Sequence, residues 1–163
     1  MIRLSPAKMK ILANRNELAQ RLQVRPAARV VFTNGVFDLL HGGHIELLWF
    51  ARGLGDILVV GVNDDASVRR LKGSSRPVFP LEERMEILAA LKPVSLLVPF
   101  AEDTPLELIR SMPRLDVLVK GGDYAPEEVV GREEVESRGG RLVLFPIRTQ
   151  NSTSDILSRL GRA

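Results

Sequence analysis

With 163 residues, 45% of them hydrophobic, the chain is long enough for a single domain whose core needs no disulfide. It contains no cysteine, which excludes disulfides, thiolate metal sites and cysteine nucleophiles. The 23 Lys and Arg residues against 20 Asp and Glu residues leave a formal charge of +3, and the basic residues are spread along the chain. This charge mildly favours anionic small molecules and gives no reason to expect a nucleic-acid partner.

The N-terminal stretch lacks the apolar segment of a signal peptide, and no apolar run is long enough to cross a bilayer. We therefore expect a cytoplasmic protein with no membrane partner. Residues 5–23 indicate one or two helical turns, with Leu18 and Leu22 four positions apart, and we treat residues 1–25 as an N-terminal helical appendage.

From residue 29 the chain alternates short β-branched runs with amphipathic segments, a pattern typical of βαβ units. We expect strands at 29–33, 57–62, 94–98, 117–120 and 142–145, and helices at 43–53, 65–71, 81–91, 105–111, 126–137 and 154–160. The strands are almost continuously apolar, as a parallel sheet covered on both faces requires. The pattern predicts one α/β domain over residues 1–163, with a Rossmann-like, doubly wound, five-stranded parallel sheet as its core at 29–160.

The two histidines of the chain lie in one four-residue stretch, HGGH, at positions 41–44 between the first expected strand and its helix. A histidine side chain donates hydrogen bonds to phosphate oxygens in its neutral and its charged form. A strand-to-helix turn also presents free backbone N–H groups. The stretch therefore predicts a polyphosphate site.

Polar groups suited to phosphates and hydroxyls follow four of the five expected strands. In open α/β sheets ligands bind beyond the carboxyl ends of the strands, so these groups predict one composite pocket. They are Thr33, Asn34, Gly35 and Asp38 after the first strand, Asn63 after the second, Lys120, Gly121 and Asp123 after the fourth, and Arg148, Ser152, Thr153 and Ser154 after the fifth.

The stretch FTNGVFDLLHGGH at 32–44 resembles the motif of the cytidylyltransferase-like nucleotidyltransferases. Within that superfamily, LKGSSRPV at 71–78, VPFAEDTP at 98–105 and LVKGGDY at 118–124 resemble the adenylyltransferase part of the ADP-heptose synthases, in its stand-alone form. The resemblance implies transfer of AMP from ATP to D-glycero-β-D-manno-heptose 1-phosphate, with Mg²⁺ bridging the triphosphate. It covers residues 8–160.

By this resemblance His41, His44 and Lys72 act on the reacting phosphates. The nucleotide is bound by Thr33, Asn34, Gly35, Gly43, Lys120, Gly121, Asp123, Arg148, Ser152, Thr153 and Ser154. The acceptor is bound by Asp38, Asn63 and Arg76, and no protein metal ligand is expected. Family members are commonly dimers, so we also expect a homodimer.

Several of these residues also have ordinary structural interpretations. The histidines could cap a helix or lie on the surface, Asp38 could form a turn, and Ser154 could be a plain helix N-cap. The stretch RTQNSTSD at 148–155 is closer to the glycerol-3-phosphate cytidylyltransferases, which leaves CTP and a glycerol or polyol phosphate as an alternative pair of substrates. A nucleotide-sensing module without turnover is the alternative from another class.

Overall fold

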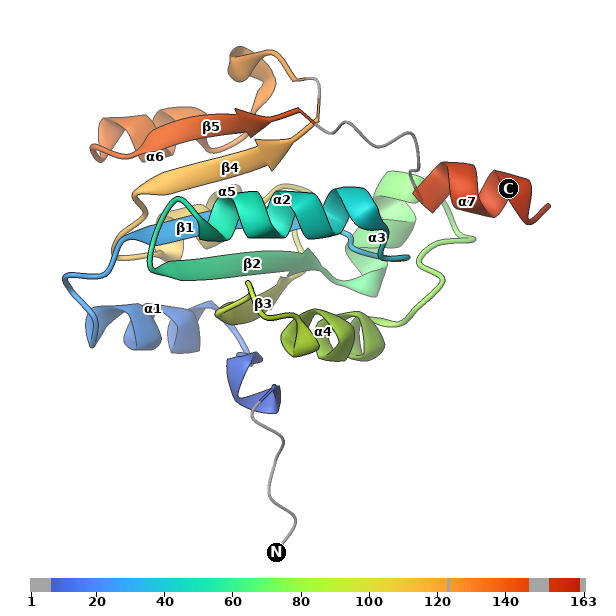
Figure 1. The fold of residues 1–163 in the computed structure, drawn as a ribbon, viewed down its shortest axis with the longest axis horizontal. Helices are drawn as coiled ribbons and strands as arrows, with labels where there is room; N and C mark the ends of the chain where they lie inside the picture. The colour runs from blue at the N-terminus through green and yellow to red at the C-terminus, as the bar shows by residue number, and fades with distance from the viewer. Residues whose placement is uncertain (1–6, 123, 147–152, 162–163) are drawn as a thin grey trace, which may run out of the picture.

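The computed structural model describes residues 7–122, 124–146 and 153–161, and five parallel strands form its single sheet, in the order β3-β2-β1-β4-β5 (Figure 1). The strands are β1 (Val30–Gly35), β2 (Ile57–Asn63), β3 (Leu96–Phe100), β4 (Val117–Gly121) and β5 (Arg141–Phe145). All seven residues of β2 are buried, which explains its unbroken apolar sequence. The expected α/β class, the parallel sheet and its five strands are confirmed.

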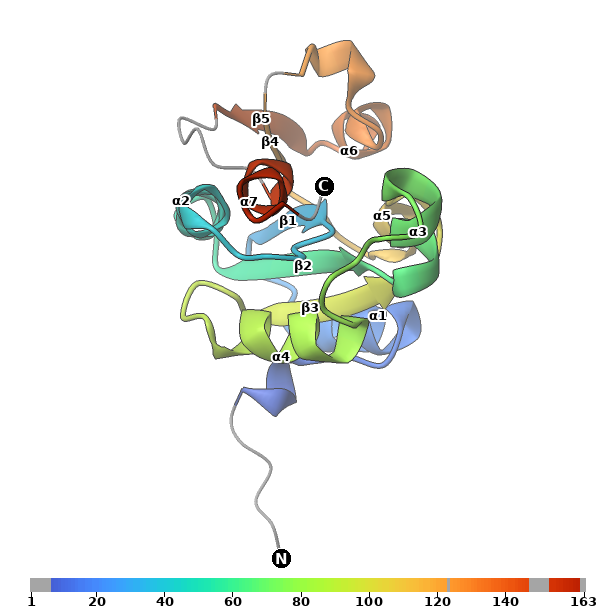
Figure 2. The same ribbon diagram turned by 90° about the vertical axis from the view of Figure 1, so that its right-hand side faces the viewer.

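Helices cover both faces of the sheet. One face, which we call the α2 face, packs against α2 (Gly42–Arg52) and α4 (Leu81–Ala90) through side chains such as Leu48 and Leu88. The opposite α5 face packs against α1 (Arg15–Gln23), α5 (Leu106–Ser111) and α6 (Arg132–Ser137) through Leu18, Ile109 and Val135. Figure 2 looks onto the carboxyl ends of the strands and shows these two layers, with α7 (Thr153–Arg159) in front of the sheet.

The N-terminal segment is tied to the edge of the sheet at β3. It contains a 3-10 turn, η1 (Lys8–Lys10), followed by a bridge in which the Leu12 N–H donates to the Leu97 carbonyl at 2.8 Å. The side chain of Leu12 is fully buried, as are those of Leu18 and Leu22 in α1. This segment therefore contributes to the core and covers an otherwise open strand edge.

The expected helix at 126–137 is wrong in one respect, because it is interrupted. The chain forms a 3-10 turn, η2 (Pro126–Glu128), and then α6, with Gly131 between them at φ 93°. A Cβ at Gly131 would lie 2.4 Å from the Ile109 side chain, so this close turn requires glycine. The break leaves η2 at the carboxyl side of the sheet, where it contributes to the pocket described below.

The third strand lies two residues later than expected. Pro99 argues against a strand in the sequence, yet β3 is an outer strand of the sheet, where a missing N–H is tolerated.

The remaining helix, α3 (Asp65–Lys72), is capped by Asp64, whose side chain accepts from the Ser67 N–H at 2.7 Å. None of the described helices has the length and apolar composition needed to span a membrane.

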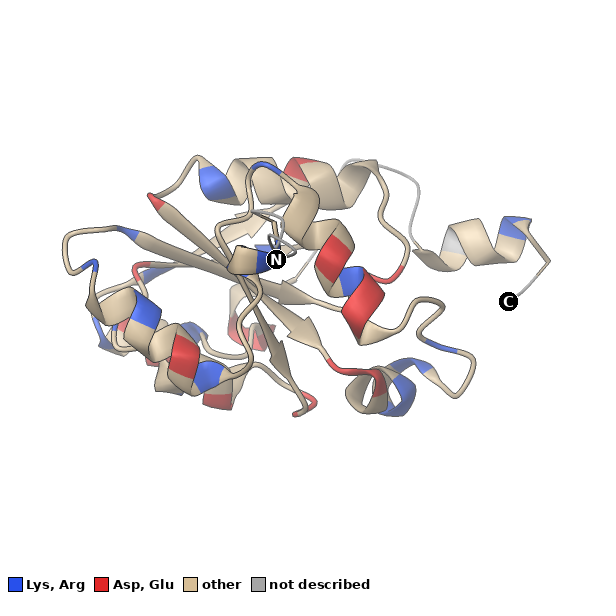
Figure 3. Ribbon diagram, turned by 90° about the horizontal axis from the view of Figure 1, so that it is seen from below, with Lys and Arg blue, Asp and Glu red and all other residues tan. Residues whose placement is uncertain are grey.

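Charged residues of both signs alternate over the helices in the view from below (Figure 3). Many are paired on one helix or between neighbouring ones, as Arg110 is with Glu107 at 2.8 Å and with Glu134 at 3.3 Å. Such exposed pairs contribute little to stability.

Candidate active site

A pocket of about 620 Å³ opens at the carboxyl ends of the strands. Most of the site residues expected from the sequence line it, although they come from four different strand ends. These are Asn34, Gly35, Asp38, His41, His44, Asn63, Lys72, Arg76, Lys120, Thr153 and Ser154. The composite pocket expected beyond the strands is thus present in the structure.

Other expected contacts lie outside this pocket. Thr33 and Gly43 are buried, and neither they nor Gly121 belong to the pocket lining. The Thr33 hydroxyl lacks a hydrogen-bond partner within the described part of the chain. The Thr33 side chain is completely covered, so the predicted phosphate contact of Thr33 stays a prediction in which the backbone N–H is the available donor. Asp123, Arg148 and Ser152 fall outside the described residues.

The two histidines stand at the start of α2 with their ring centroids 3.8 Å apart. The His41 backbone N–H donates to Nδ1 of His44 at 3.4 Å, so Nδ1 is the acceptor and the proton of neutral His44 lies on Nε2. Burial, and then the charge of His41, lowers the pKa of His44 to about 4. His44 is therefore a neutral N–H donor near pH 7.

Phe37 supports the His44 ring from the loop between β1 and α2. Its ring centroid is 5.2 Å from that of His44, and its side chain is buried. Phe37 has a φ of 49°, in the left-handed region that side chains other than glycine rarely adopt. The sequence motif contains this residue, but only the structure shows that an uncommon backbone conformation brings its ring against the histidine.

Two lysines from different elements line the pocket. Lys72 is the last residue of α3, and Lys120 lies near the end of β4. Burial, with a further contribution from the charge of Lys72, lowers the pKa of Lys120. The Lys120 ammonium also lies 5.5 Å from the centroid of the Tyr124 ring. Both lysines line the same pocket, where a bound anion would reduce their mutual repulsion.

Asp38 and Arg76 line the pocket but bind each other. The Arg76 Nε donates to the Asp38 carboxylate at 2.6 Å, and the N–H groups of Val78 and Phe79 donate to the same carboxylate at 2.8 Å and 3.0 Å. Both oxygens of Asp38 are thus engaged in fixing the segment that follows Lys72. We infer that Asp38 positions the loop, which leaves Arg76 as the member of the pair with further N–H donors.

Asn63 is held in a similar way at the end of β2. Its side-chain amide donates to the Ser67 hydroxyl at 2.9 Å, and that hydroxyl donates to the Glu102 carbonyl at 3.1 Å. These bonds link the start of α3 to the loop after β3. If Asn63 binds the acceptor substrate as expected, it therefore does so through its side-chain oxygen.

Arg84 is a buried side chain that joins loops around the pocket, and nothing in the sequence indicated this role. It lies on α4, is 1% exposed, and donates to the carbonyls of Phe79, Val36 and Asn63 at 3.0, 2.6 and 2.9 Å. It also pairs with Asp65 at 2.8 Å. One guanidinium thus joins the loop after β1, the end of β2 and the segment before α4. A lone arginine in an amphipathic helix gives no sequence signal for such a role.

An open parallel sheet with two histidines at a helix N-terminus and two lysines in one pocket at its carboxyl edge defines a nucleotidyltransferase-type α/β domain. The family model described as Cytidylyltransferase-like matches residues 32–159, and the chain belongs to that family. The family resemblance seen in the sequence motifs is confirmed.

Curated relatives are similar over most of this chain. It is 55% identical over 148 residues to the Bifunctional protein HldE of Syntrophotalea carbinolica, covering 90% of this chain and 30% of that protein. It is 58% identical over 132 residues to the Bifunctional protein HldE of Citrifermentans bemidjiense, covering 81% of this chain and 27% of that protein. The chain thus spans about a third or less of the length of these relatives.

Solved structures share the fold. The lipopolysaccharide core biosynthesis protein from Thermoplasma volcanium superimposes with a TM-score of 0.61 at 27% identity, over 77% of this chain and 100% of that one. Pantoate-beta-alanine ligase from Francisella tularensis gives a TM-score of 0.57 at 18% identity, over 88% of this chain and 68% of that one. The second likeness concerns the fold alone.

Proposed function

We propose that this chain transfers AMP from ATP to a heptose 1-phosphate, D-glycero-β-D-manno-heptose 1-phosphate, and releases pyrophosphate. The observation that carries the proposal is that His41, His44, Lys72 and Lys120, from three separate elements, line one pocket at the carboxyl edge of the sheet. The motif resemblance to ADP-heptose synthases and the high identity to the HldE proteins support the choice of reaction.

In this reaction an oxygen of the sugar phosphate attacks the α-phosphorus of ATP, and the bond between that phosphorus and the bridging oxygen to the β-phosphate breaks. The attacking phosphate is already anionic, so the protein needs neither a nucleophile nor a base. It must align two anions that repel each other and stabilise the negative charge that develops on the leaving pyrophosphate.

The neutral His44 suits the second task. Its Nε2–H is a fixed donor, and its burial makes a hydrogen bond to an oxygen anion stronger than it would be in water. The N-terminus of α2 adds a favourable field at the same place. Binding of the triphosphate would raise the pKa of His44, because the phosphate charge favours the imidazolium.

Lys72 and Lys120 suit the first task. Together they lower the mutual repulsion of the two substrate phosphates, and a lysine can follow a phosphate that moves during the reaction. The described residues include no group of three or more His, Cys, Asp or Glu that could hold a metal ion. Mg²⁺ would be bound together with the nucleotide and would neutralise part of the triphosphate charge.

CTP with glycerol 3-phosphate or another polyol phosphate is the second candidate. It is favoured by the stretch at 148–155, most of which lies outside the described residues. The test is pyrophosphate release with ATP or CTP against a panel containing heptose 1-phosphates and glycerol 3-phosphate. We expect turnover with ATP and the heptose phosphate, and absence of activity with any heptose phosphate would reject the first choice.

His44→Ala is the variant that tests the chemical role. We expect turnover to fall by a factor of about 10² or more, the size seen when an oxyanion donor is removed, with a smaller change in ATP affinity. Glu46→Ala is the matched control, since Glu46 is an exposed residue of the same helix and lies outside the pocket. Equal losses in turnover and affinity for His44→Ala would contradict a transition-state role.

We further propose that the chain acts as a homodimer in the cytoplasm.

A further inference from the structure

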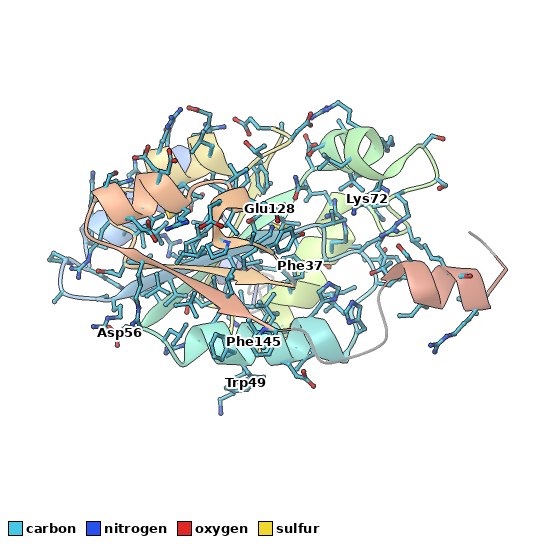
Figure 4. All side chains as sticks on the ribbon, turned by 90° about the horizontal axis from the view of Figure 1, so that it is seen from above. Phe37, Trp49, Asp56, Lys72, Glu128 and Phe145 are labelled. Carbon is cyan, nitrogen blue, oxygen red and sulfur yellow. The ribbon has the colours of Figure 1, made fainter. Side chains whose placement is uncertain are left out.

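The pocket has a wall that the proposed chemistry does not use. It is formed by Asp103, Thr104 and Pro105 in the loop between β3 and α5, and by Glu128, Val129 and Val130 in and after η2. These segments belong to the α5 face, where Val129 packs into the same core cluster as Leu108 and Ile109 of α5. Figure 4 shows Glu128 and Lys72 on one side of the sheet and Trp49, which belongs to α2, on the other side.

The histidines lie across the pocket from this wall, at the N-terminus of α2. The Thr153 hydroxyl at the start of α7 donates to the Leu39 carbonyl at 3.3 Å, just before His41, so α7 also borders the α2 side. The lysines come from the end of α3 and the end of β4, and both line the same pocket. The pocket therefore has a histidine end and a carboxylate end, with two lysines in its lining.

Charge decides which ligand group can occupy each end. The Glu128 carboxylate, and to a smaller extent that of Asp103, which pairs with Arg70 at 2.7 Å, would repel a triphosphate, whereas the histidine and lysine groups attract it. In a phosphoryl transfer the attacking and leaving oxygens stand roughly in line on opposite sides of the phosphorus. If the pyrophosphate leaves on the histidine side, the acceptor must approach from the side of Asp103 and Glu128.

We propose that Asp103 and Glu128 bind hydroxyl groups of the acceptor sugar and thereby determine acceptor specificity. The inference rests on the proposed function, since it places the sugar phosphate of that reaction. Carboxylate oxygens accept hydrogen bonds from sugar hydroxyls, and the apolar side chains of Pro105, Val129 and Val130 offer surface for the C–H groups of a sugar ring.

Each carboxylate is oriented through one oxygen. The Arg70 Nε donates to Oδ1 of Asp103 at 2.8 Å, and the Ala125 N–H donates to Oε2 of Glu128 at 3.1 Å. No hydrogen bond to Oδ2 of Asp103 or Oε1 of Glu128 is found within residues 7–122, 124–146 and 153–161. A carboxylate fixed by one oxygen can accept from a ligand with the other.

The test uses Glu128→Gln and Asp103→Asn, which keep the shape of the side chain and remove its charge. We expect the KM for heptose 1-phosphate to rise at least about tenfold in each, the size of one lost charge-assisted hydrogen bond, with the KM for ATP within about twofold. Glu127→Gln is the matched control, because Glu127 precedes Glu128 in η2 but pairs with Arg132 at 3.1 Å and lies outside the pocket.

Methyl phosphate, an acceptor without hydroxyl groups, separates recognition of the sugar from loss of the phosphate site. The variants should use it as well as the unchanged protein does, or slightly better, because a repulsive charge is gone. An unchanged KM for the heptose phosphate in both variants overturns the inference, as does a rise in the KM for ATP alone, which would mean that the wall binds the nucleotide.

Failure of the proposed function gives a different result. If the unchanged protein turns over another hydroxyl-bearing phosphate and no heptose phosphate, the comparison is made with that acceptor. A selective rise in its KM then upholds the role of Asp103 and Glu128 while the heptose proposal falls. Calorimetric titration of each acceptor into protein holding a non-hydrolysable ATP analogue gives the same comparison without turnover, and failure of every sugar phosphate to bind overturns both.

Discussion

Asp38 and Arg76 form a 2.6 Å ion pair in which the carboxylate side chain is fully buried and the guanidinium side chain is 11% exposed. The same carboxylate accepts from two consecutive backbone N–H groups, those of Val78 and Phe79. The loop after Lys72 is thereby fastened to the loop that carries the histidines. Two segments of the pocket that are far apart in the sequence are thus fixed relative to each other by a single side chain.

Asp38→Asn should therefore destabilise the protein although it keeps the side-chain shape. One oxygen becomes an NH₂ group that faces N–H donors, and Arg76 loses its counter-charge. We expect a loss of about 3 kcal/mol in the free energy of unfolding, measured by urea denaturation. Asp56→Asn is the control, since exposed Asp56 accepts, among the described residues, only from the Arg29 N–H and should change stability by less than about 1 kcal/mol. Equal effects of the two changes would contradict the anchoring role.

The lowered pKa of His44 predicts a loss of stability in acid. The folded protein holds His44 neutral down to about pH 4, whereas in the unfolded chain this imidazole takes up its proton near its ordinary pKa of 6.5. The contribution of neutral His44 to the free energy of unfolding is therefore fully present above about pH 6.5, declines as the pH falls and levels off below about pH 4. Its size is about 3 kcal/mol at most. Urea denaturation near pH 7, 5.5 and 4 should show a smaller decline for His44→Asn, and parallel curves would contradict the prediction.

Thr33→Val should keep or increase stability. The Thr33 hydroxyl is buried without a partner among the described residues, so its removal abolishes a desolvation cost while the buried methyl group remains. We expect the free energy of unfolding to stay the same or to rise by up to about 1 kcal/mol. A loss above about 1 kcal/mol would show that the hydroxyl has a partner in the folded protein, and calorimetric melting of the two proteins would detect it.

Much of the fold could be predicted from the sequence because parallel strands covered on both faces have unmistakably apolar runs. The expected starts of β2 and β4 are those of the structure. The position of β3 could not be predicted, because the tolerance of Pro99 depends on its place in an outer strand. The break at Gly131 was equally hidden, since it results from contact with Ile109, 22 residues earlier in the chain.

The site could be predicted where its residues follow strands directly. His41, His44 and Lys120 line the pocket because every parallel strand ends at the same edge of the sheet. The sequence could not show that the Asp38 carboxylate accepts hydrogen bonds from the Val78 and Phe79 N–H groups. Nor could it show that Glu128 lines the pocket from a turn on the α5 face. Both facts depend on how loops distant in the sequence pack together.

Arg84 gives the strongest example of such a hidden role, and it carries the last prediction. Its guanidinium is almost fully buried and satisfies three carbonyls and one carboxylate. Arg84→Met would leave these acceptors without a donor, and we expect a loss of about 3 to 5 kcal/mol in the free energy of unfolding. Arg84→Lys keeps the charge but cannot reach all four acceptors from one ammonium group, so it should lose less.

Arg21→Met provides the control, because Arg21 forms an exposed pair with Glu17 at 3.7 Å within α1 and should change stability by less than about 1 kcal/mol. If Arg84→Met does not fold, Arg84→Lys still decides the matter by urea denaturation. A loss for Arg84→Lys no greater than that for the control would show that the four acceptors do not depend on the guanidinium, because an ammonium group would then satisfy them equally well.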